Sequence, residues 1–291
     1  MDSEITFTSD GLTLAGSLHV PDGRAADQKL PAVIVLHGFI GAKDNSYSEV
    51  VSRLMESWGY VVLRIDFRGC GKSEGKRGYV LCHDQVADTR NAMTWLAERP
   101  EVDPARIAVL GHSFGAAIAA YTASTDTRFA AAIISCGWGH GERKFRGQHP
   151  TPEAWEKFTG LLAEGRAHKA RTGETLMVSR WDVVPMAEHL RKNLSHLAQT
   201  VVAADTAQSM FDFKAEEVIG QLAPRPVLFM HGADDTVTPV EQSIRMWELA
   251  GQPKDLVLIT GTDHFPIFGK DSRGRDILKG WMERYFPATP A

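Results

Sequence analysis

A single serine lies between two glycines at residues 111–115, where the chain reads Gly-His-Ser-Phe-Gly. The apolar run before this pentapeptide predicts a buried strand, and the alanine-rich run after it predicts a helix. A serine on such a tight strand-to-helix turn projects its hydroxyl outward, and the positive end of the helix faces the same place. The pattern therefore predicts that Ser113 is a nucleophile. The alternative is a glycine turn in which Ser113 only caps the helix.

A serine hydroxyl reacts readily only when a base removes its proton and an acid orients that base. His264 follows one predicted buried strand, and Asp234 and Asp235 follow the predicted strand before it. Serine, acid and histidine thus occur in this order along the chain, each at the end of a predicted strand. This order predicts a catalytic triad of Ser113, one of the two aspartates, and His264.

The intermediate that forms when a serine attacks a carbonyl needs N–H donors for its negatively charged oxygen. The N–H of Phe114, directly after the serine, is one predicted donor. The second predicted donor is the N–H of Phe39, in the loop after the apolar run 32–38. His37 is expected to brace that loop by hydrogen bonding rather than to take part in catalysis.

Strand and helix patterns alternate on both sides of these residues, which indicates parallel β-α-β units in one sheet. At the N-terminus, two β-rich segments separated by Asp10-Gly11 predict a hairpin. The predicted buried strands are 32–38, 60–67, 106–112, 130–136, 225–232 and 255–260. The predicted helices are 46–58, 84–98, a helix that begins at Ser113, 239–250 and 274–286.

The alternation stops near Trp138 and resumes after about 80 residues that are rich in charge, histidine and tryptophan. Such a length indicates a cap or lid rather than a surface loop. The predicted division is a core domain of residues 1–137 and 218–291 and a cap insertion of residues 138–217. The tryptophans of the cap either line an aryl pocket or form the cap's own small core. Trp181 is the first candidate for a substrate contact.

Composition excludes several other classes of protein. The net charge of −4 and the lack of a Lys/Arg stripe argue against a nucleic-acid partner. No apolar run is long enough to span a membrane, and no signal peptide is expected. The three cysteines are scattered, which predicts reduced thiols and a cytoplasmic protein. The histidines lack metal-ligand spacing, so neither a metal nor a cofactor is expected.

The chain resembles the serine esterases and S33 peptidases of the α/β-hydrolase superfamily, and within it the cinnamoyl/feruloyl esterases. The matching motifs are "LHGFIGAKD", "RIDFRGCGKSEG", "VLGHSFGA", "LFMHGADDTVTP" and "TDHF". The resemblance implies an α/β-hydrolase fold, with a mostly parallel, doubly wound sheet and an inserted cap. The family pattern His-Gly-x-x-Asp-x-Val, counted from His231, implies that Asp235 rather than Asp234 is the acid.

The expected function is cleavage of small carboxylic esters, with aryl or short-to-medium acyl groups, through an acyl-enzyme on Ser113. The same triad would also serve a C–C bond hydrolase, a thioesterase, an amidase or peptidase, or a cofactor-free haloperoxidase. The sequence does not separate these reactions, and it leaves a homodimer open. A non-catalytic binding protein on this fold is disfavoured, because such proteins usually lose a member of the triad.

Overall fold

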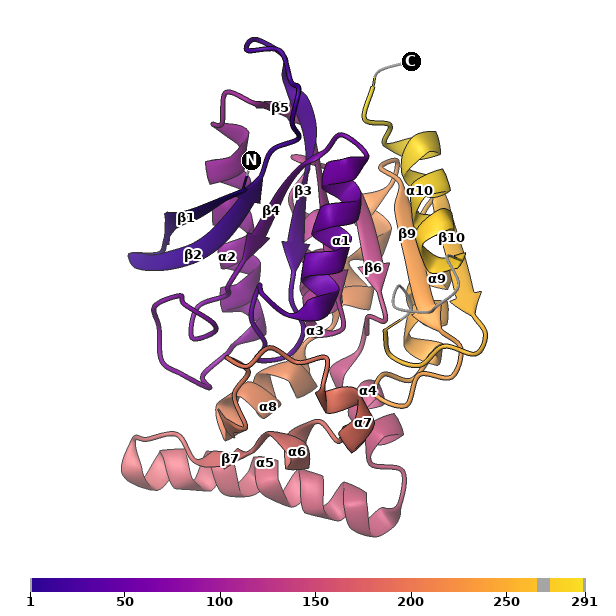
Figure 1. Cartoon of the computed structure of the whole chain (residues 1–291). Coiled ribbons are helices and arrows are strands. Elements are labelled where there is room, and N and C mark those ends of the chain that lie inside the picture. Colours follow the sequence, from indigo (N-terminus) through magenta and orange to yellow (C-terminus); the bar gives the residue numbers. More distant parts are fainter. Residues whose placement is uncertain (1, 266–272, 290–291) are drawn as a thin grey trace.

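The computed structural model describes residues 2–265 and 273–289, and its centre is an eight-stranded sheet (Figure 1). The strand order is β1-β2-β4-β3-β5-β6-β9-β10. β1 pairs with β2 and β2 with β4 in antiparallel fashion, and the other neighbouring strands are parallel. The predicted mostly parallel sheet is confirmed. The strands are β1 (Asp2–Ser9), β2 (Leu12–His19), β3 (Leu30–Leu36), β4 (Val61–Ile65), β5 (Val102–His112), β6 (Phe129–Ser135), β9 (Val227–Gly232) and β10 (Lys254–Ile259).

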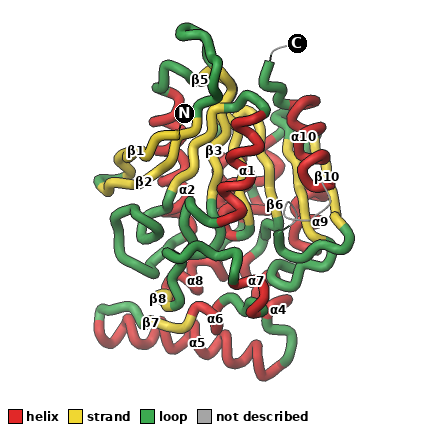
Figure 2. Tube along the Cα trace, in the orientation of Figure 1, coloured by secondary structure: helices red, strands yellow, loops and turns green. Residues whose placement is uncertain are grey.

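Helices cover both faces of this sheet (Figure 2). α1 (Ser46–Ser57) and α10 (Arg273–Tyr285) bury their apolar side chains against one face. α2 (Cys82–Ala97), α3 (Phe114–Thr125) and α9 (Glu241–Leu249) pack against the other. The predicted strands and helices of the core are therefore present, with bounds that differ by a few residues.

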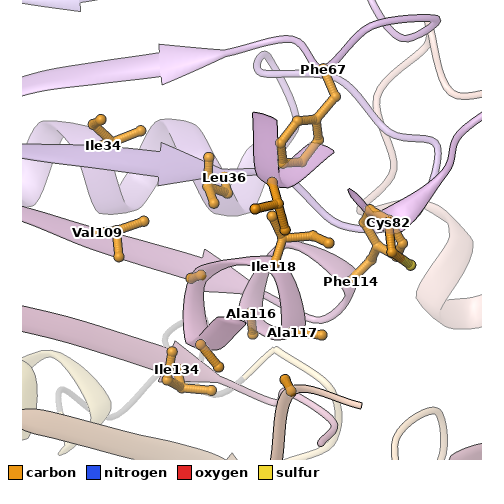
Figure 3. Packing of buried hydrophobic residues seen from close by; sticks show 14 of the residues in the cluster. Ile34, Leu36, Phe67, Cys82, Val109, Phe114, Ala116, Ala117, Ile118 and Ile134 are labelled. Carbon is orange, nitrogen blue, oxygen red and sulfur yellow. The ribbon is translucent and has the colours of Figure 1, made fainter. Parts of the chain in front are cut away.

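The helix α3 fixes the position of Ser113, which directly precedes it. Its small residues, such as Ala116 and Ala117, let the helix backbone approach the sheet closely, and both are fully buried. Ile118 packs among the side chains of Leu36 and Phe67 in the same cluster (Figure 3). A helix buried in this way cannot shift without opening the core, so the start of α3 is a rigid platform.

The chain between β6 and β9 lies beyond the carboxyl ends of the parallel strands, with α5 furthest from the sheet (Figure 1). β7 and β8 form a separate antiparallel pair. Neither strand is predicted from the sequence, because each has only three residues and is too short to show a periodic pattern. The elements are α4 (Gly141–Gln148), α5 (Pro152–Thr172), β7 (Met177–Ser179), α6 (Arg180–Val183), α7 (Glu188–Arg191), β8 (Val201–Ala203), α8 (Ala204–Asp212) and two 3₁₀ helices, Ala215–Glu217 and Ile219–Leu222.

Two tryptophans of the predicted cap pack among other aromatic side chains. Trp138 is 1% exposed and contacts the rings of Phe114 and Phe213. Trp155 lies with its ring centroid 6.0 Å from that of Phe158. These contacts favour the interpretation of both residues as core rather than as pocket lining.

The three cysteines are free and buried, as the scattered spacing predicts. No helix among residues 2–265 and 273–289 combines the length and the apolar character that a membrane crossing requires.

Candidate active site

The turn at Ser113 is tight and strained. Ser113 has φ 56° and ψ −115°, a conformation that a non-glycine residue rarely adopts. A Cβ atom on Gly111 would lie 2.1 Å from the carbonyl oxygen of Gly115, and one on Gly115 would lie 2.6 Å from that of Leu36. Both glycines are therefore required where the strand and the helix cross. The Ser113 N–H donates to the Ser135 carbonyl at 2.9 Å, which fixes the turn on the sheet.

His264 and Asp235 form a hydrogen-bonded pair, with 2.7 Å between Nδ1 of the histidine and Oδ2 of the aspartate. The other carboxylate oxygen accepts the N–H groups of Val237 and Thr238 at 2.7 and 2.8 Å. Burial raises the pKa of Asp235, but the charge of His264 and the hydrogen bonds to His231 and His264 outweigh it and hold the pKa well below its usual range. Asp235 is therefore an ionised carboxylate with a fixed direction. Asp234 is exposed, and the structure does not bring it to His264.

His231 supports the same carboxylate, a role that sequence analysis missed. Its Nε2 lies 3.1 Å from Oδ2 of Asp235 and 3.0 Å from the carbonyl of Thr238. Because both neighbours are acceptors, Nε2 carries the proton, and Nδ1 accepts from the hydroxyl of Ser243 at 2.7 Å. The signal in the sequence was a histidine at the end of a buried strand, four residues before the acid.

Cys136, Asp235 and His264 are the only described residues that place three potential metal ligands together, with their ligand atoms within 4.8 Å of one another. Burial, together with the charge of Asp235, raises the pKa of the Cys136 thiol well above its usual value. The thiol is therefore protonated, and Nδ1 of His264 already binds Asp235. This chemistry fits an acid–base pair with a packed thiol better than a metal site.

The two predicted oxyanion donors both lie in segments of the chain next to Ser113. α3 begins at Phe114, so the N–H of this residue has no acceptor within the helix. The loop that contains Phe39 runs beside the serine, because a Cβ on Gly38 would lie 3.6 Å from the Cβ of Ser113. The structure thus places both residues that carry the predicted N–H donors next to Ser113.

His37 braces the loop that carries Phe39, as predicted. Its Nδ1 lies 2.8 Å from the Gly38 carbonyl, and its Nε2 accepts the N–H of Phe67 at 3.3 Å. Burial lowers the pKa of the imidazole, so the ring is neutral and suited to donate at one nitrogen while it accepts at the other.

Ser113 and His264 line one pocket of about 470 Å³, part of which is open to solvent. One wall comes from the core and the other from the segment between β6 and β9. The described core residues that line it are Gly38, Phe39, Gly41, Asn45, His112, Ser113, Val237, His264 and Phe265. The opposite wall consists of Arg180, Val184, Met186, Asn193, Leu194 and Ser195.

Trp181, the predicted substrate contact, is not among the described residues that line this pocket. The guanidinium carbons of Arg180 and Arg191 lie 5.0 and 4.0 Å from its ring centroid. Trp181 instead borders a separate hollow together with Phe158 and His149. The residue before it, Arg180, is the one that reaches the pocket.

His112 is a further residue that lines the pocket, and no role for it was predicted from the sequence. Its ring stacks on Tyr47 with centroids 4.0 Å apart and lies 4.8 Å from the ring of His264. Burial, then the charge of His264, lowers the pKa of His112 well below its usual value. A neutral ring therefore packs against the imidazole of His264 without competing for its proton.

Hydrogen bonds tie the far wall of the pocket to the loop of Phe39. Nη2 of Arg180 donates to the Phe39 carbonyl at 3.0 Å, and the N–H of Gln199 donates to the Ile40 carbonyl at 3.3 Å. Ile40 has φ 40°, so this loop is held in a conformation that few side chains tolerate. The position of the Phe39 N–H thus depends on contacts with residues far away in the sequence.

The comparison with curated proteins finds relatives along nearly the whole chain. The acyltransferase drtE of Aspergillus calidoustus is 28% identical over 301 residues, which cover 97% of this chain and 94% of drtE. The polyketide transferase grgF of Penicillium sp. is 27% identical over 297 residues, which cover 96% of this chain and 97% of grgF.

Solved structures share the fold. The crystal structure of the α/β hydrolase GrgF from Penicillium sp. sh18 has a TM-score of 0.81 at 24% identity, and covers 98% of this chain and 99% of GrgF. Est1E of Butyrivibrio proteoclasticus with bound ferulic acid has a TM-score of 0.69 at 20% identity, and covers 96% and 98% of the two chains. The resemblance to α/β-hydrolases is confirmed. Because the model of the family "Serine aminopeptidase, S33" matches residues 27–271, the protein belongs to this family of α/β-hydrolases.

Proposed function

We propose that the protein is a serine hydrolase that cleaves carboxylic esters through an acyl-enzyme on Ser113. One observation carries this proposal: Ser113, on its strained turn, lines the same pocket as His264, whose Nδ1 lies 2.7 Å from Asp235. A serine, an imidazole and a carboxylate are the groups that a triad uses to transfer an acyl group to serine, which supports the proposal.

In the proposed mechanism, His264 takes the hydroxyl proton as Oγ of Ser113 attacks the carbonyl carbon. Asp235 keeps the Nδ1–H of His264 directed at its carboxylate and stabilises the imidazolium that forms. The N–H groups of Phe39 and Phe114 bind the oxyanion. His264 then protonates the leaving alcohol, and water attacks the acyl-enzyme with His264 as the base.

The lining of the pocket supports a substrate of small to moderate size. Much of the wall is apolar, with Val184, Met186 and Leu194 opposite Val237 and Phe265. This apolar lining beside Ser113 suits an aryl or short-to-medium acyl group, and a feruloyl ester is one example. We further propose that residues 138–217 act as the cap that selects this group.

Transfer of the acyl group to an acceptor other than water is a second candidate function. Relatives that align with almost the whole chain are named an acyltransferase and a polyketide transferase. Both reactions share the acyl-enzyme and differ only in the nucleophile that releases the acyl group.

The test is a panel of matched substrates: aryl and alkyl esters, thioesters, amides and a β-diketone, each with and without an added alcohol. Ester hydrolysis is expected to exceed hydrolysis of the matched amide, thioester and diketone in kcat/KM. A faster reaction with one of these would replace the ester proposal. If esters of the added alcohol predominate among the products, the protein is an acyltransferase.

A further inference from the structure

Arg180 carries a charge into the wall of the pocket. It is the first residue of α6, lines the pocket together with Ser113, and is only 2% exposed. A buried guanidinium loses its hydration, and proteins usually compensate for this with a carboxylate partner.

No such carboxylate exists among the residues that the structure describes. Nη1 donates to the Gln199 carbonyl at 3.2 Å and Nη2 to the Phe39 carbonyl at 3.0 Å. The Nε–H is buried and has no acceptor in the described part of the chain. The Cζ atom of Arg180 lies 5.7 Å from the ring centroid of Phe39 and 5.0 Å from that of Trp181. The group is held in place, but its charge is not neutralised.

The charges around Arg180 also leave its guanidinium without a negative partner among the described residues. Burial, together with a smaller effect of the nearby charge of Arg191, lowers the pKa of Arg180 to about 10, so the side chain is still a cation at neutral pH. The thiol of Cys70 is the group that acts in the opposite direction. That thiol is itself buried, which raises its pKa far above neutrality, so it supplies no negative charge.

We propose that the substrate supplies the missing charge, as a carboxylate that binds Arg180 inside the pocket of Ser113. This inference rests on the proposed ester hydrolysis and narrows it to acidic esters, such as monoesters of dicarboxylic acids. A guanidinium fixed through two carbonyls keeps further N–H groups for a carboxylate, and its planar geometry suits that ligand. The apolar side chains of the same wall contact the carbon chain between the ester and the acid.

The competing interpretation is that Arg180 only holds the Phe39 carbonyl in place, and with it the loop whose Phe39 N–H is the predicted oxyanion donor. If Arg180 only positions this loop, its loss lowers kcat/KM for every ester by the same factor, because each ester forms the same oxyanion. An anion site acts only on esters that carry a negative charge. The ratio of kcat/KM between acidic and neutral esters therefore separates the two roles, whatever the change in overall rate.

The experiment compares monoethyl esters of dicarboxylic acids, from succinic to suberic acid, with ethyl esters of monocarboxylic acids of equal chain length. A second series places the carboxylate on the alcohol, as in acetyl esters of hydroxy acids. We expect the wild type to prefer the acidic ester of one series by roughly 10- to 100-fold in kcat/KM. Arg180→Met should abolish that preference, and Arg180→Lys should retain part of it.

Arg146→Gln is the matched control, because it removes an exposed arginine of α4 that does not line the pocket. This variant should keep the wild-type ratio. A wild-type ratio near one in both series overturns the inference, and so does an equal loss on acidic and neutral esters in Arg180→Met.

A binding measurement makes the inference independent of turnover. Calorimetric titration of Ser113→Ala with adipate should show binding, whereas neutral adipamide should bind at least about tenfold more weakly. Adding Arg180→Lys should weaken the adipate signal. Equal binding of adipate and adipamide would contradict the anion site. If the wild-type protein hydrolyses no ester but still binds adipate, only the proposed function is contradicted.

Discussion

The two walls of the pocket are built differently. One wall includes Ser113, between β5 and the buried helix α3, and His264, in the loop after β10, whose partner Asp235 follows β9. The opposite wall comes from short helices and loops. On the sheet side, both carboxylate oxygens of Asp235 accept hydrogen bonds from the protein. The other wall presents the apolar side chains of Val184, Met186 and Leu194 together with polar side chains, among them the unpaired charge of Arg180. A rigid side with fixed hydrogen bonds suits chemistry that is the same for every substrate, and a wall that combines apolar side chains with one charge suits selection among substrates. The following variants test that division.

The largest effect is expected at the acid. Asp235→Asn should reduce kcat on an ester substrate by roughly a thousand- to ten-thousandfold, because an amide does not stabilise the imidazolium and favours the wrong tautomer. Asp234→Asn is the matched control and should retain a rate within about twofold of the wild type, since surface substitutions rarely have larger effects. If the two variants exchanged these phenotypes, Asp235 would not be the acid of the triad.

A smaller effect is expected at His231, which positions Asp235 without touching the substrate. His231→Gln should lower kcat by roughly 10- to 100-fold, as is usual when a group that orients a catalytic residue is lost. KM should change little, because the pocket wall is intact. Steady-state kinetics check this, and a change confined to KM would show that His231 acts on binding instead.

The segment between β6 and β9 also contains a buried lysine that bears on stability. Lys144 is 2% exposed, and its Nζ lies 3.9 Å from the Phe145 ring centroid without a hydrogen-bond acceptor in the described residues. Burial lowers the pKa of Lys144 from 10.5 to about 7. Between these two pH values the unfolded chain binds more protons than the folded one, so stability should rise with pH through this window.

Lys144→Met should therefore raise the free energy of unfolding at and below neutral pH, by roughly 1–3 kcal/mol. The gain should shrink as the pH rises to 10.5 and beyond, because only above that pH is the wild-type side chain neutral in both states. Urea denaturation at pH values on both sides of neutrality measures this. A gain that stayed constant or increased with pH would contradict the assignment.

The smallest effect is expected at the apolar wall. Met186→Ala should change the ranking of aryl against short alkyl esters a few-fold, because it enlarges the pocket by part of one side chain. The rate at which a small phosphonate labels Ser113 should stay the same, since that reaction needs only the triad and the oxyanion donors. Trp181→Phe is the control and should leave the ranking unchanged, because its ring borders another hollow. If the ranking changed in Trp181→Phe but not in Met186→Ala, Trp181 rather than Met186 would contact the substrate.

The same division explains what could be predicted from the sequence. The positions of Ser113 and His264 follow from local patterns, because Ser113 directly follows one strand and His264 lies in the loop after another, and the apolar run of each strand is visible in the sequence. The contact of Arg180 with the Phe39 carbonyl joins residues 141 positions apart, and no local pattern indicates it. Trp181 stood out by residue type, but the direction of its side chain depends on the tertiary packing of short elements that lack periodicity.

Covalent labelling tests the central claim, that Ser113 is the nucleophile, most directly. Wild-type protein treated with a fluorophosphonate should gain the mass of one phosphonyl group, and peptide mapping should place it on Ser113 within "GHSFG". Ser113→Ala should gain none, and its kcat on esters should fall by at least about a thousandfold although it folds normally. Equal labelling of Ser113→Ala, or near-wild-type turnover by that variant, would contradict the account.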